Sequence, residues 1–158
     1  LTGLSTFRGT GRRFEVKGTA HGVRVIDDYG HHPTELKVTL EAARRYAADG
    51  RLIVIFQPHR YSRTQAFAQG FADVLDTADR AIVLEVYAAS EKPIDGVTSK
   101  IITSKMSKGE YIPNFVEVTD SVIAMAEPGD VIMTLGAGDV SSLAPIIVDG
   151  LARRFNQS

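Results

Sequence analysis

The sequence predicts an α/β domain in which helices cover both faces of a mostly parallel sheet of about six strands, with one antiparallel strand at the N-terminal edge. Three observations support this fold. Short apolar runs alternate with amphipathic helical patterns along most of the chain. The run Leu52–Phe56 is apolar throughout, as expected for a strand that is covered on both faces. Only the first two strand-like segments are separated by a turn short enough for a hairpin.

Composition narrows the possible functions. The chain has 158 residues, of which 44% are hydrophobic and 23% charged, as is ordinary for one globular domain. Its formal net charge of -1 gives no overall attraction to nucleic acid or to an anionic membrane, so any anion site must be local. The absence of cysteine excludes disulfides and thiolate metal sites. No apolar run approaches the ~20 residues that span a bilayer.

The beginning of the chain reads as a domain edge. Residues 1–12 are rich in Gly and Thr and show no periodicity, so we expect a linker there and a single domain over residues 13–158. No signal peptide is visible. Because Leu1 is not an initiator Met, we expect a processed chain or a piece of a longer protein.

Six short segments show strand character, and most of them are rich in branched apolar side chains. The first two are joined by a predicted hairpin turn at Thr19–Gly22, and the last follows a turn at Glu127–Asp130. In chain order, the predicted strands are Arg13–Lys17, Val23–Asp28, Leu52–Phe56, Ala81–Val86, Phe115–Val118 and Val131–Leu135.

Helices are predicted between these strands. Pro33 suits the first residue of a helix, because its missing N–H would have no partner there, and Asp49-Gly50 ends that helix. Ser62 and Gln65 form a capping-box pattern before an apolar stripe of Phe67, Phe71 and Val74. The other predicted helices are Val97–Ser107, Asp120–Ala126 and a C-terminal helix that ends near Phe155 and that Pro145 should delay or kink.

Two stretches rich in reactive side chains each follow a predicted strand. Asp27–Glu35 (DDYGHHPTE) ends the second strand and Gln57–Thr64 (QPHRYSRT) follows the third. Right-handed crossovers place the loops after parallel strands along one edge of the sheet, where open α/β sheets bind ligands. We therefore expect these stretches to meet there, beside the Tyr87–Gly96 loop and the Gly136–Asp139 turn.

Arg60 and Arg63 predict an anion site. They lie just before and just inside the helix that Ser62 is expected to cap, and a helix N-terminus carries partial positive charge and free N–H groups. A guanidinium presents a planar fork of donors that suits a carboxylate or a phosphate. The alternative is that both arginines lie on the surface and pair with nearby acids.

The adjacent histidines His31 and His32 leave several interpretations open. They could bind a metal together with the neighbouring aspartates or His59, although no spacing typical of a zinc site is present. Alternatively, one histidine caps the helix that starts at Pro33, and the other hydrogen-bonds a ligand.

The aspartates end a strand, so the side chains of Asp27 and Asp28 should point to opposite faces. This divergence makes them poor partners for acid–base catalysis. One of them could instead accept hydrogen bonds from ribose hydroxyls in the crevice. Tyr29 either lines the pocket or packs.

The segment Gly136-Ala137-Gly138-Asp139 resembles a short phosphate-cradling turn, although a tight connection from strand to helix explains it equally well. Asp139 suits an N-cap on either account. The chain contains no Gly-x-x-x-x-Gly-Lys-Ser/Thr loop, so the main phosphate loop of any nucleotide chemistry lies outside it. Ser62, Ser141 and Ser142 lack the context of a serine-hydrolase nucleophile.

The two reactive stretches resemble motifs of the C-terminal domain of the Mur ligase family of peptidoglycan synthesis, and they are specific to its alanine-adding member. The resemblance extends over essentially the whole chain, whereas the glycine-rich turn is not specific. Supporting matches are Phe14 and Glu15, the Tyr87–Gly96 loop with Glu91, Pro93, Ile94 and Gly96, and the Gly136–Asp139 turn.

The resemblance implies a three-domain cytoplasmic enzyme that uses ATP and Mg²⁺ to activate the carboxylate of UDP-N-acetylmuramate as an acyl phosphate, which the amine of L-alanine then attacks. This Rossmann-like domain would bind the amino acid and close over ATP. An N-terminal domain would hold the UDP-sugar, and a central domain would hold most of the ATP and the magnesium. The domain alone would then be inactive, with no catalytic residue and no metal site of its own. No protein partner, nucleic acid or membrane is predicted.

The resemblance also implies roles for individual residues. The amino-acid carboxylate would be clamped by side chains from both stretches, so that catalysis by this domain is orientation and charge neutralisation. His31, Arg60 and Arg63 would surround the L-alanine carboxylate, Tyr29 would line the same pocket, Asp28 would bind the ATP ribose, Arg13 would reach the ATP phosphates, and Gly136, Ala137, Gly138 and Asp139 would form the neighbouring wall.

Two other functions remain open. A metal-dependent phosphoesterase could use the aspartate–histidine cluster, but it would need further ligands at other strand ends, and the later strands supply few. A non-catalytic anion-binding or interaction module would use the arginines alone.

Overall fold

A computed structural model describes residues 14–156 as one mixed sheet with helices on both faces. The sheet has six strands in the order β1-β2-β6-β3-β4-β5. Strand β1 runs antiparallel to β2, and every other neighbouring pair is parallel. The predicted fold class is therefore confirmed. The strands are β1 Glu15–Ala20, β2 Val23–Asp28, β3 Leu52–Phe56, β4 Arg80–Val83, β5 Glu110–Tyr111 and β6 Val131–Leu135.

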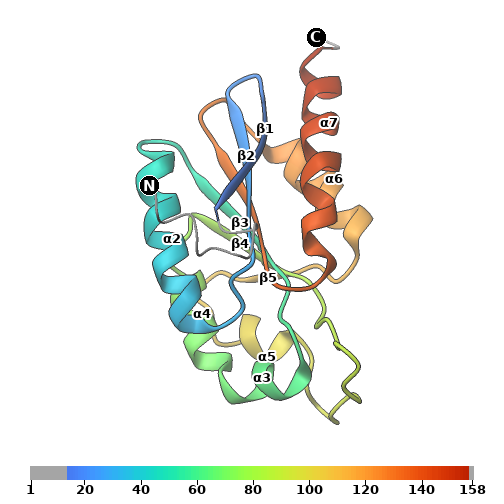
Figure 1. The fold of residues 1–158 in the computed structure, drawn as a ribbon. Coiled ribbons are helices and arrows are strands. Elements are labelled where there is room, and N and C mark those ends of the chain that lie inside the picture. The colour runs from blue at the N-terminus through green and yellow to red at the C-terminus, as the bar shows by residue number, and fades with distance from the viewer. Residues whose placement is uncertain (1–13, 157–158) are drawn as a thin grey trace, which may run out of the picture.

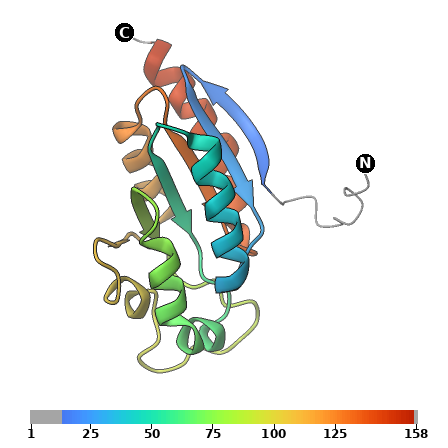
Figure 2. The same ribbon diagram turned by 90° about the vertical axis from the view of Figure 1, so that its left-hand side faces the viewer.

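The helices form two layers. Figure 1 shows α2 (Pro33–Ala47) and α4 (Ala68–Leu75) against one face of the sheet, and α6 (Phe115–Met125) and α7 (Leu143–Asn156) against the other. Shorter helices lie toward the carboxyl ends of the parallel strands, where the loops emerge (Figures 1 and 2). These are α3 (Tyr61–Ala66), α5 (Lys100–Thr103) and the 3-10 helix η1 (Asp139–Ser142).

The strand side chains divide the core in two. All five residues of β3 are buried. Leu52, Val54 and Phe56 pack with the α2 and α4 side, whereas Ile53 and Ile55 pack with the α6 and α7 side. Successive strand residues point to opposite faces, so a continuous apolar run is the pattern that a doubly covered strand requires.

The hairpin turn is tighter than expected. His21 and Gly22 alone connect β1 to β2, with φ values of 50° and 83°. Two left-handed residues in succession match the twist of a two-residue hairpin. Strand β1 consequently extends to Ala20, beyond the predicted end at Lys17.

The structure corrects two element predictions after β4. The predicted strand Phe115–Val118 is wrong, because these residues form the first turns of α6. The side chain of Asn114 accepts hydrogen bonds from the backbone N–H groups of Val116 (2.8 Å) and Glu117 (3.0 Å), which starts a helix in spite of the branched residues. The predicted helix Val97–Ser107 shortens to α5, and the edge strand β5 follows it.

Two other predicted elements are present at the expected places in the chain. Strand β4 is shorter than the predicted Ala81–Val86, but Leu84 continues its pairing by donating from its backbone N to the carbonyl of Phe56 at 2.9 Å. The expected late start of the C-terminal helix is confirmed, since α7 begins at Leu143 and Pro145 lies in its first turn. Across residues 14–156, none of the helices has the length and apolar character that crossing a bilayer requires.

The cap of α6 can be tested directly. We expect Asn114→Ala to lower the free energy of unfolding by about 1 kcal/mol, because two backbone donors lose their acceptor. Asn114→Asp keeps an acceptor and adds a negative charge at a helix N-terminus, so it should stay close to the unaltered protein. Urea unfolding followed by circular dichroism measures both. Equal losses for the two variants would contradict the capping role.

Candidate functional site

The aspartates at the end of β2 are buried and used by the protein itself. Asp27 accepts a hydrogen bond from the Thr134 hydroxyl at 2.6 Å. Asp28, which is 1% exposed, accepts hydrogen bonds from the backbone N–H groups of Phe14 (2.7 Å) and Gly30 (2.9 Å) and from the hydroxyl of Thr39 (3.1 Å). The expected divergence of the two carboxylates is confirmed. Asp28 therefore ties the incoming chain and the loop after β2 to helix α2.

The two histidines divide their tasks as one of the open interpretations proposed. His32 is the N-cap of α2, where its Nδ1 accepts a hydrogen bond from the backbone N–H of Thr34 at 3.2 Å. Glu35 accepts from the backbone N–H groups of His31 (3.0 Å) and His32 (3.1 Å), which completes a capping box. The cap removes His32 from any metal site and leaves His31 to face the neighbouring loop.

Four rings from three loops form a row across the carboxyl edge of the sheet. Tyr29 and His31 meet edge to face at 5.3 Å between ring centroids. His31 lies 5.8 Å from His59, and His59 stacks on Tyr87 at 5.6 Å with 14° between the ring planes. Nδ1 of His31 lies 3.2 Å from the carbonyl of Tyr29, which can only accept, so this nitrogen carries the proton.

The loop after β3 brings the arginines to the same place. Arg63 donates from Nη1 to Nδ1 of His59 at 3.1 Å. Burial lowers the pKa of His59, and the neighbouring charges of Arg63, His31 and Arg60 lower it further. His59 is therefore neutral at pH 7 and offers Arg63 an acceptor. The predicted meeting of the two reactive stretches is confirmed by the contact between His31 and His59.

Arg60 adopts a backbone conformation that is unusual for a side chain of its kind. Its φ is 74° and its ψ is 137°, in a region that favours glycine. The backbone N–H of Arg60 donates to the carbonyl of Tyr87 at 2.7 Å, and its carbonyl accepts from the hydroxyl of Thr64 at 2.7 Å. These bonds hold the strained residue at the start of α3, with an exposed side chain.

The capping box predicted at Ser62 is wrong. The N-cap of helix α3 is Arg60, two residues before Ser62, and the helix runs from Tyr61 to Ala66, so the predicted single helix is divided between α3 and α4. Both the backbone N–H and the hydroxyl of Ser62 donate to Glu91, a residue of the loop after β4. These hydrogen bonds lower the pKa of Glu91 and keep it ionised. An acidic side chain distant in sequence therefore satisfies this helix end.

The turn after β6 is joined to the loop after β3 through Gln57. The Gln57 side chain donates from Nε2 to Oδ1 of Asp139 at 2.8 Å and accepts from the backbone N–H of Val140 at 3.2 Å. A Cβ atom on Gly138 would lie 2.5 Å from Oε1 of Gln57. Gln57 thus holds Asp139 and joins the Gly136–Asp139 turn to the loop that carries the arginines.

Sequence reasoning missed four residues of this arrangement as site residues: Gln57, His59, Tyr87 and Glu91. Their position after strands β3 and β4 was the available signal. Their tasks depend on partners in other loops. Arg13, which was predicted to reach the ATP phosphates, lies outside the described residues.

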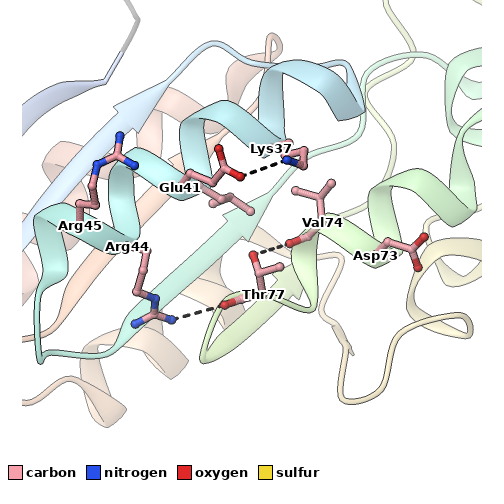
Figure 3. Close-up of a pocket in the computed structure, with 8 residues that line it drawn as sticks. Lys37, Glu41, Arg44, Arg45, Asp73, Val74 and Thr77 are labelled. Carbon is pink, nitrogen blue, oxygen red and sulfur yellow. Dashed lines mark hydrogen bonds and ion pairs between the residues drawn. The ribbon is translucent and has the colours of Figure 1, made fainter.

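A separate cavity of about 480 Å³ lies between α2 and α4. Its floor includes Leu40 and Val74, and Figure 3 shows Lys37 paired with Glu41 and Arg44 reaching Thr77 across it. Thr77 precedes β4, so the cavity lies toward the amino ends of the strands. We place the candidate site at the opposite edge, because the two reactive stretches meet there.

Comparison with known proteins decides the family. A family model described as "Mur ligase, glutamate ligase domain" matches residues 12–138. The chain belongs to the Mur ligase family. Fifty per cent of positions over 162 residues are identical to UDP-N-acetylmuramate--L-alanine ligase of Mycobacterium ulcerans, covering 100% of this chain and 33% of that protein. The chain thus spans about a third of the length of such relatives.

Two further Mur ligases support this assignment. UDP-N-acetylmuramate--L-alanine ligase of Paenarthrobacter aurescens is 51% identical over 148 residues, covering 94% of this chain and 32% of that protein. The crystal structure of UDP-N-acetylmuramate-alanine ligase from Thermotoga maritima superposes with a TM-score of 0.71 at 27% identity, covering 93% of this chain and 30% of that one. The Mur ligase fold therefore extends from β1 into α7.

The metal-dependent alternative gains no support. Within residues 14–156, no three His, Cys, Asp or Glu side chains are grouped so that they could hold a metal ion. Three side chains that the sequence offered as metal ligands accept hydrogen bonds inside the protein. These are Asp27, Asp28 and His32.

The conformation of Arg60 generates a stability prediction. We expect Arg60→Gly to be more stable than Arg60→Ala by about 1 kcal/mol, since glycine adopts a positive φ without a steric penalty. At Arg45 in helix α2 the order should reverse, because glycine destabilises a helix relative to alanine. Chemical unfolding of the four variants measures both differences. An Arg60→Ala variant as stable as Arg60→Gly would show that this backbone is not strained.

The lowered pKa of His59 generates a pH prediction. Below pH ~6.5 the unfolded state binds a proton at this residue more readily than the folded state, so stability falls as the pH decreases through that value toward the folded pKa. Above it the residue contributes no pH dependence. We expect His59→Gln to make the stability profile between pH 7 and 5 shallower, measured by urea unfolding. His21→Gln, at the hairpin, controls for loss of an imidazole, and a His59→Gln profile parallel to the unaltered one would contradict the assignment.

Proposed function

We propose that this chain is the amino-acid-binding domain of an ATP-dependent ligase that joins L-alanine to UDP-N-acetylmuramate. The observation that carries the proposal is the convergence of His31, His59 and Arg63. The first two rings lie 5.8 Å apart, and the guanidinium of Arg63 lies 3.1 Å from Nδ1 of His59. Donors from two loops therefore approach one point at the carboxyl edge of the sheet. The relatives at 50% identity carry the name of such a ligase.

In this proposal the amino acid is held by its carboxylate. Arg60 and Arg63 supply positive charge and paired donors, and His31 presents its ring from the opposite loop. Tyr29 limits the pocket on the far side of His31. Clamping the carboxylate orients the amine toward the activated carboxylate of the sugar substrate, so this domain contributes positioning and charge neutralisation.

The greater length of the relatives motivates the roles proposed for further domains. Because the chain spans 33% of the Mycobacterium ulcerans ligase, we propose that residues 13–158 act with further domains that hold the UDP-sugar, Mg²⁺ and most of the ATP. ATP would supply the phosphoryl group that activates the muramate carboxylate as an acyl phosphate. Asp28 and Arg13 stay predicted contacts of its ribose and phosphates. Asp28 already accepts hydrogen bonds from Phe14, Gly30 and Thr39, so a hydrogen bond from a ribose hydroxyl would be additional.

The clamp can be tested in the full-length enzyme that contains this domain. We expect Arg63→Ala to raise the KM for L-alanine about 100-fold, since hydrogen bonds to charged groups contribute up to about 3 kcal/mol and each 1.4 kcal/mol is about tenfold. The measurement is L-alanine-dependent phosphate release. Arg45→Ala, which removes an exposed arginine of α2, is the matched control. Unchanged activity of Arg63→Ala would eliminate the clamp.

Measurements on the purified chain distinguish the two alternative functions. Stoichiometric manganese or zinc in the purified chain, together with phosphoester hydrolysis, would favour the phosphoesterase. Tight carboxylate binding that does not respond to nucleotide would favour a non-catalytic anion-binding module.

A further inference from the structure

Tyr87 contacts the loop that carries both arginines of the clamp. Its backbone hydrogen-bonds Arg60, and its ring stacks on His59, which accepts a hydrogen bond from Arg63. The backbone N–H of Tyr87 donates to the carbonyl of Pro58 at 2.8 Å, and its carbonyl accepts from the N–H of Arg60 at 2.7 Å. These bonds form an isolated parallel bridge between His59 and Tyr87. Tyr87 thus holds the segment in which Arg60 takes its positive φ.

The ring of Tyr87 acts on the second arginine through His59. It stacks on the imidazole at 5.6 Å, with the two planes 14° apart. The edge of the same imidazole accepts the hydrogen bond from Arg63 through Nδ1 at 3.1 Å. A ring that moved away from His59 would therefore release the acceptor that fixes the Arg63 guanidinium.

The ring of Tyr87 lies directly against Gly138, which has no side chain and leaves the space that the ring occupies. A Cβ atom at position 138 would lie 2.6 Å from Cγ and 2.9 Å from Cδ1 of Tyr87, closer than van der Waals contact allows. The φ of Gly138 is -89°, outside the left-handed region, so space is the reason for glycine here. The turn after β6 consequently sets the position of the ring.

We propose that Tyr87, seated on Gly138, is a positioning residue for the amino-acid carboxylate clamp. The inference rests on the proposed function, and it assigns Gly138 a specific task within the wall that Gly136–Asp139 is predicted to form. The aromatic ring and the backbone of Tyr87 perform the positioning. Within residues 14–156 the hydroxyl of Tyr87 makes no hydrogen bond, and the residue is 37% exposed. Removing the hydroxyl should therefore cost nothing.

The kinetic test uses the full-length enzyme and three single variants. We expect Tyr87→Leu and Gly138→Ala each to raise the KM for L-alanine about tenfold, with kcat and the KM for ATP changed much less, because the affected contact is an aromatic stack that orients Arg63. Tyr87→Phe should match the unaltered enzyme. The double variant Tyr87→Leu with Gly138→Ala should be no worse than Gly138→Ala alone, since the alanine already displaces the ring besides pressing on Oε1 of Gln57, 2.5 Å from its Cβ.

A structural readout accompanies the kinetics. In the isolated chain, the Arg63 side-chain Nε–H resonance should shift in Tyr87→Leu and Gly138→Ala but not in Tyr87→Phe. Tyr46→Leu removes an aromatic ring that packs on Phe14 and Arg24, away from the arginine loop, and controls for a general loss of stability. It should change neither the resonance nor the KM for L-alanine.

The possible outcomes separate the two proposals. An active enzyme whose KM for L-alanine is unaffected by Tyr87→Leu overturns the positioning role, as does Tyr87→Phe behaving like Tyr87→Leu. Shifted Arg63 resonances without any L-alanine-dependent turnover of the unaltered protein would overturn the proposed function while the placement of Arg63 by Tyr87 stands.

Discussion

The placement of β6 between β2 and β3 is the constraint on which the site depends. Leu135, the last residue of β6, pairs with Asp28 on one side and with Phe56 on the other. Gly136 donates to the carbonyl of Asp28 at 3.1 Å, and Gln57 donates to the carbonyl of Leu135 at 3.0 Å. Three strands therefore end at the same level. Their loops begin side by side, although they are separated by up to about a hundred residues of chain.

Side chains then fix each loop to its neighbour. Asp28 secures the loop after β2 through backbone N–H groups, so its buried charge is compensated by hydrogen bonds. Gln57 joins the loop after β3 to the turn after β6, and Glu91 reaches from the loop after β4 to Ser62. The loops after β3, β4 and β6 are thus joined by side-chain hydrogen bonds, whereas Asp28 fixes the loop after β2 to its own strand and to Phe14. Such mutual support preorganises side chains for a ligand that must be held in one orientation.

The strained backbone of Arg60 is supported on both sides. Its φ is positive, its N–H donates to the carbonyl of Tyr87, and its carbonyl accepts from the hydroxyl of Thr64. His59 stays neutral because burial and the neighbouring cations oppose its protonation, and it can therefore accept from Arg63. Strain and a shifted pKa at one short segment are the pattern expected of a ligand-binding loop.

The sequence was sufficient to predict most of the fold and the meeting of the two reactive stretches at one edge of the sheet. Leu52–Phe56 is a strand as predicted, since an uninterrupted apolar run specifies a strand covered on both faces, and Val131–Leu135 is also a strand as predicted. Pro33 starts its helix as predicted, because its fixed φ and missing N–H suit the first turn of a helix. The failure at Phe115–Val118 has the same local character, since the cap supplied by Asn114 outweighs the strand preference of the branched residues.

Only the tertiary structure decided how the loop residues work. Ser62 has the sequence of a cap, yet Glu91 satisfies the helix from 29 residues away. Tyr87 begins a loop that matches the family, but its contacts with His59, Arg60 and Gly138 were decided by the fold. The sequence by itself determined which strands form and which reactive residues follow them, because periodicity and caps act over a few residues. The partners of those residues were decided by strand order and register, which bring distant segments together and leave no local signal in the chain.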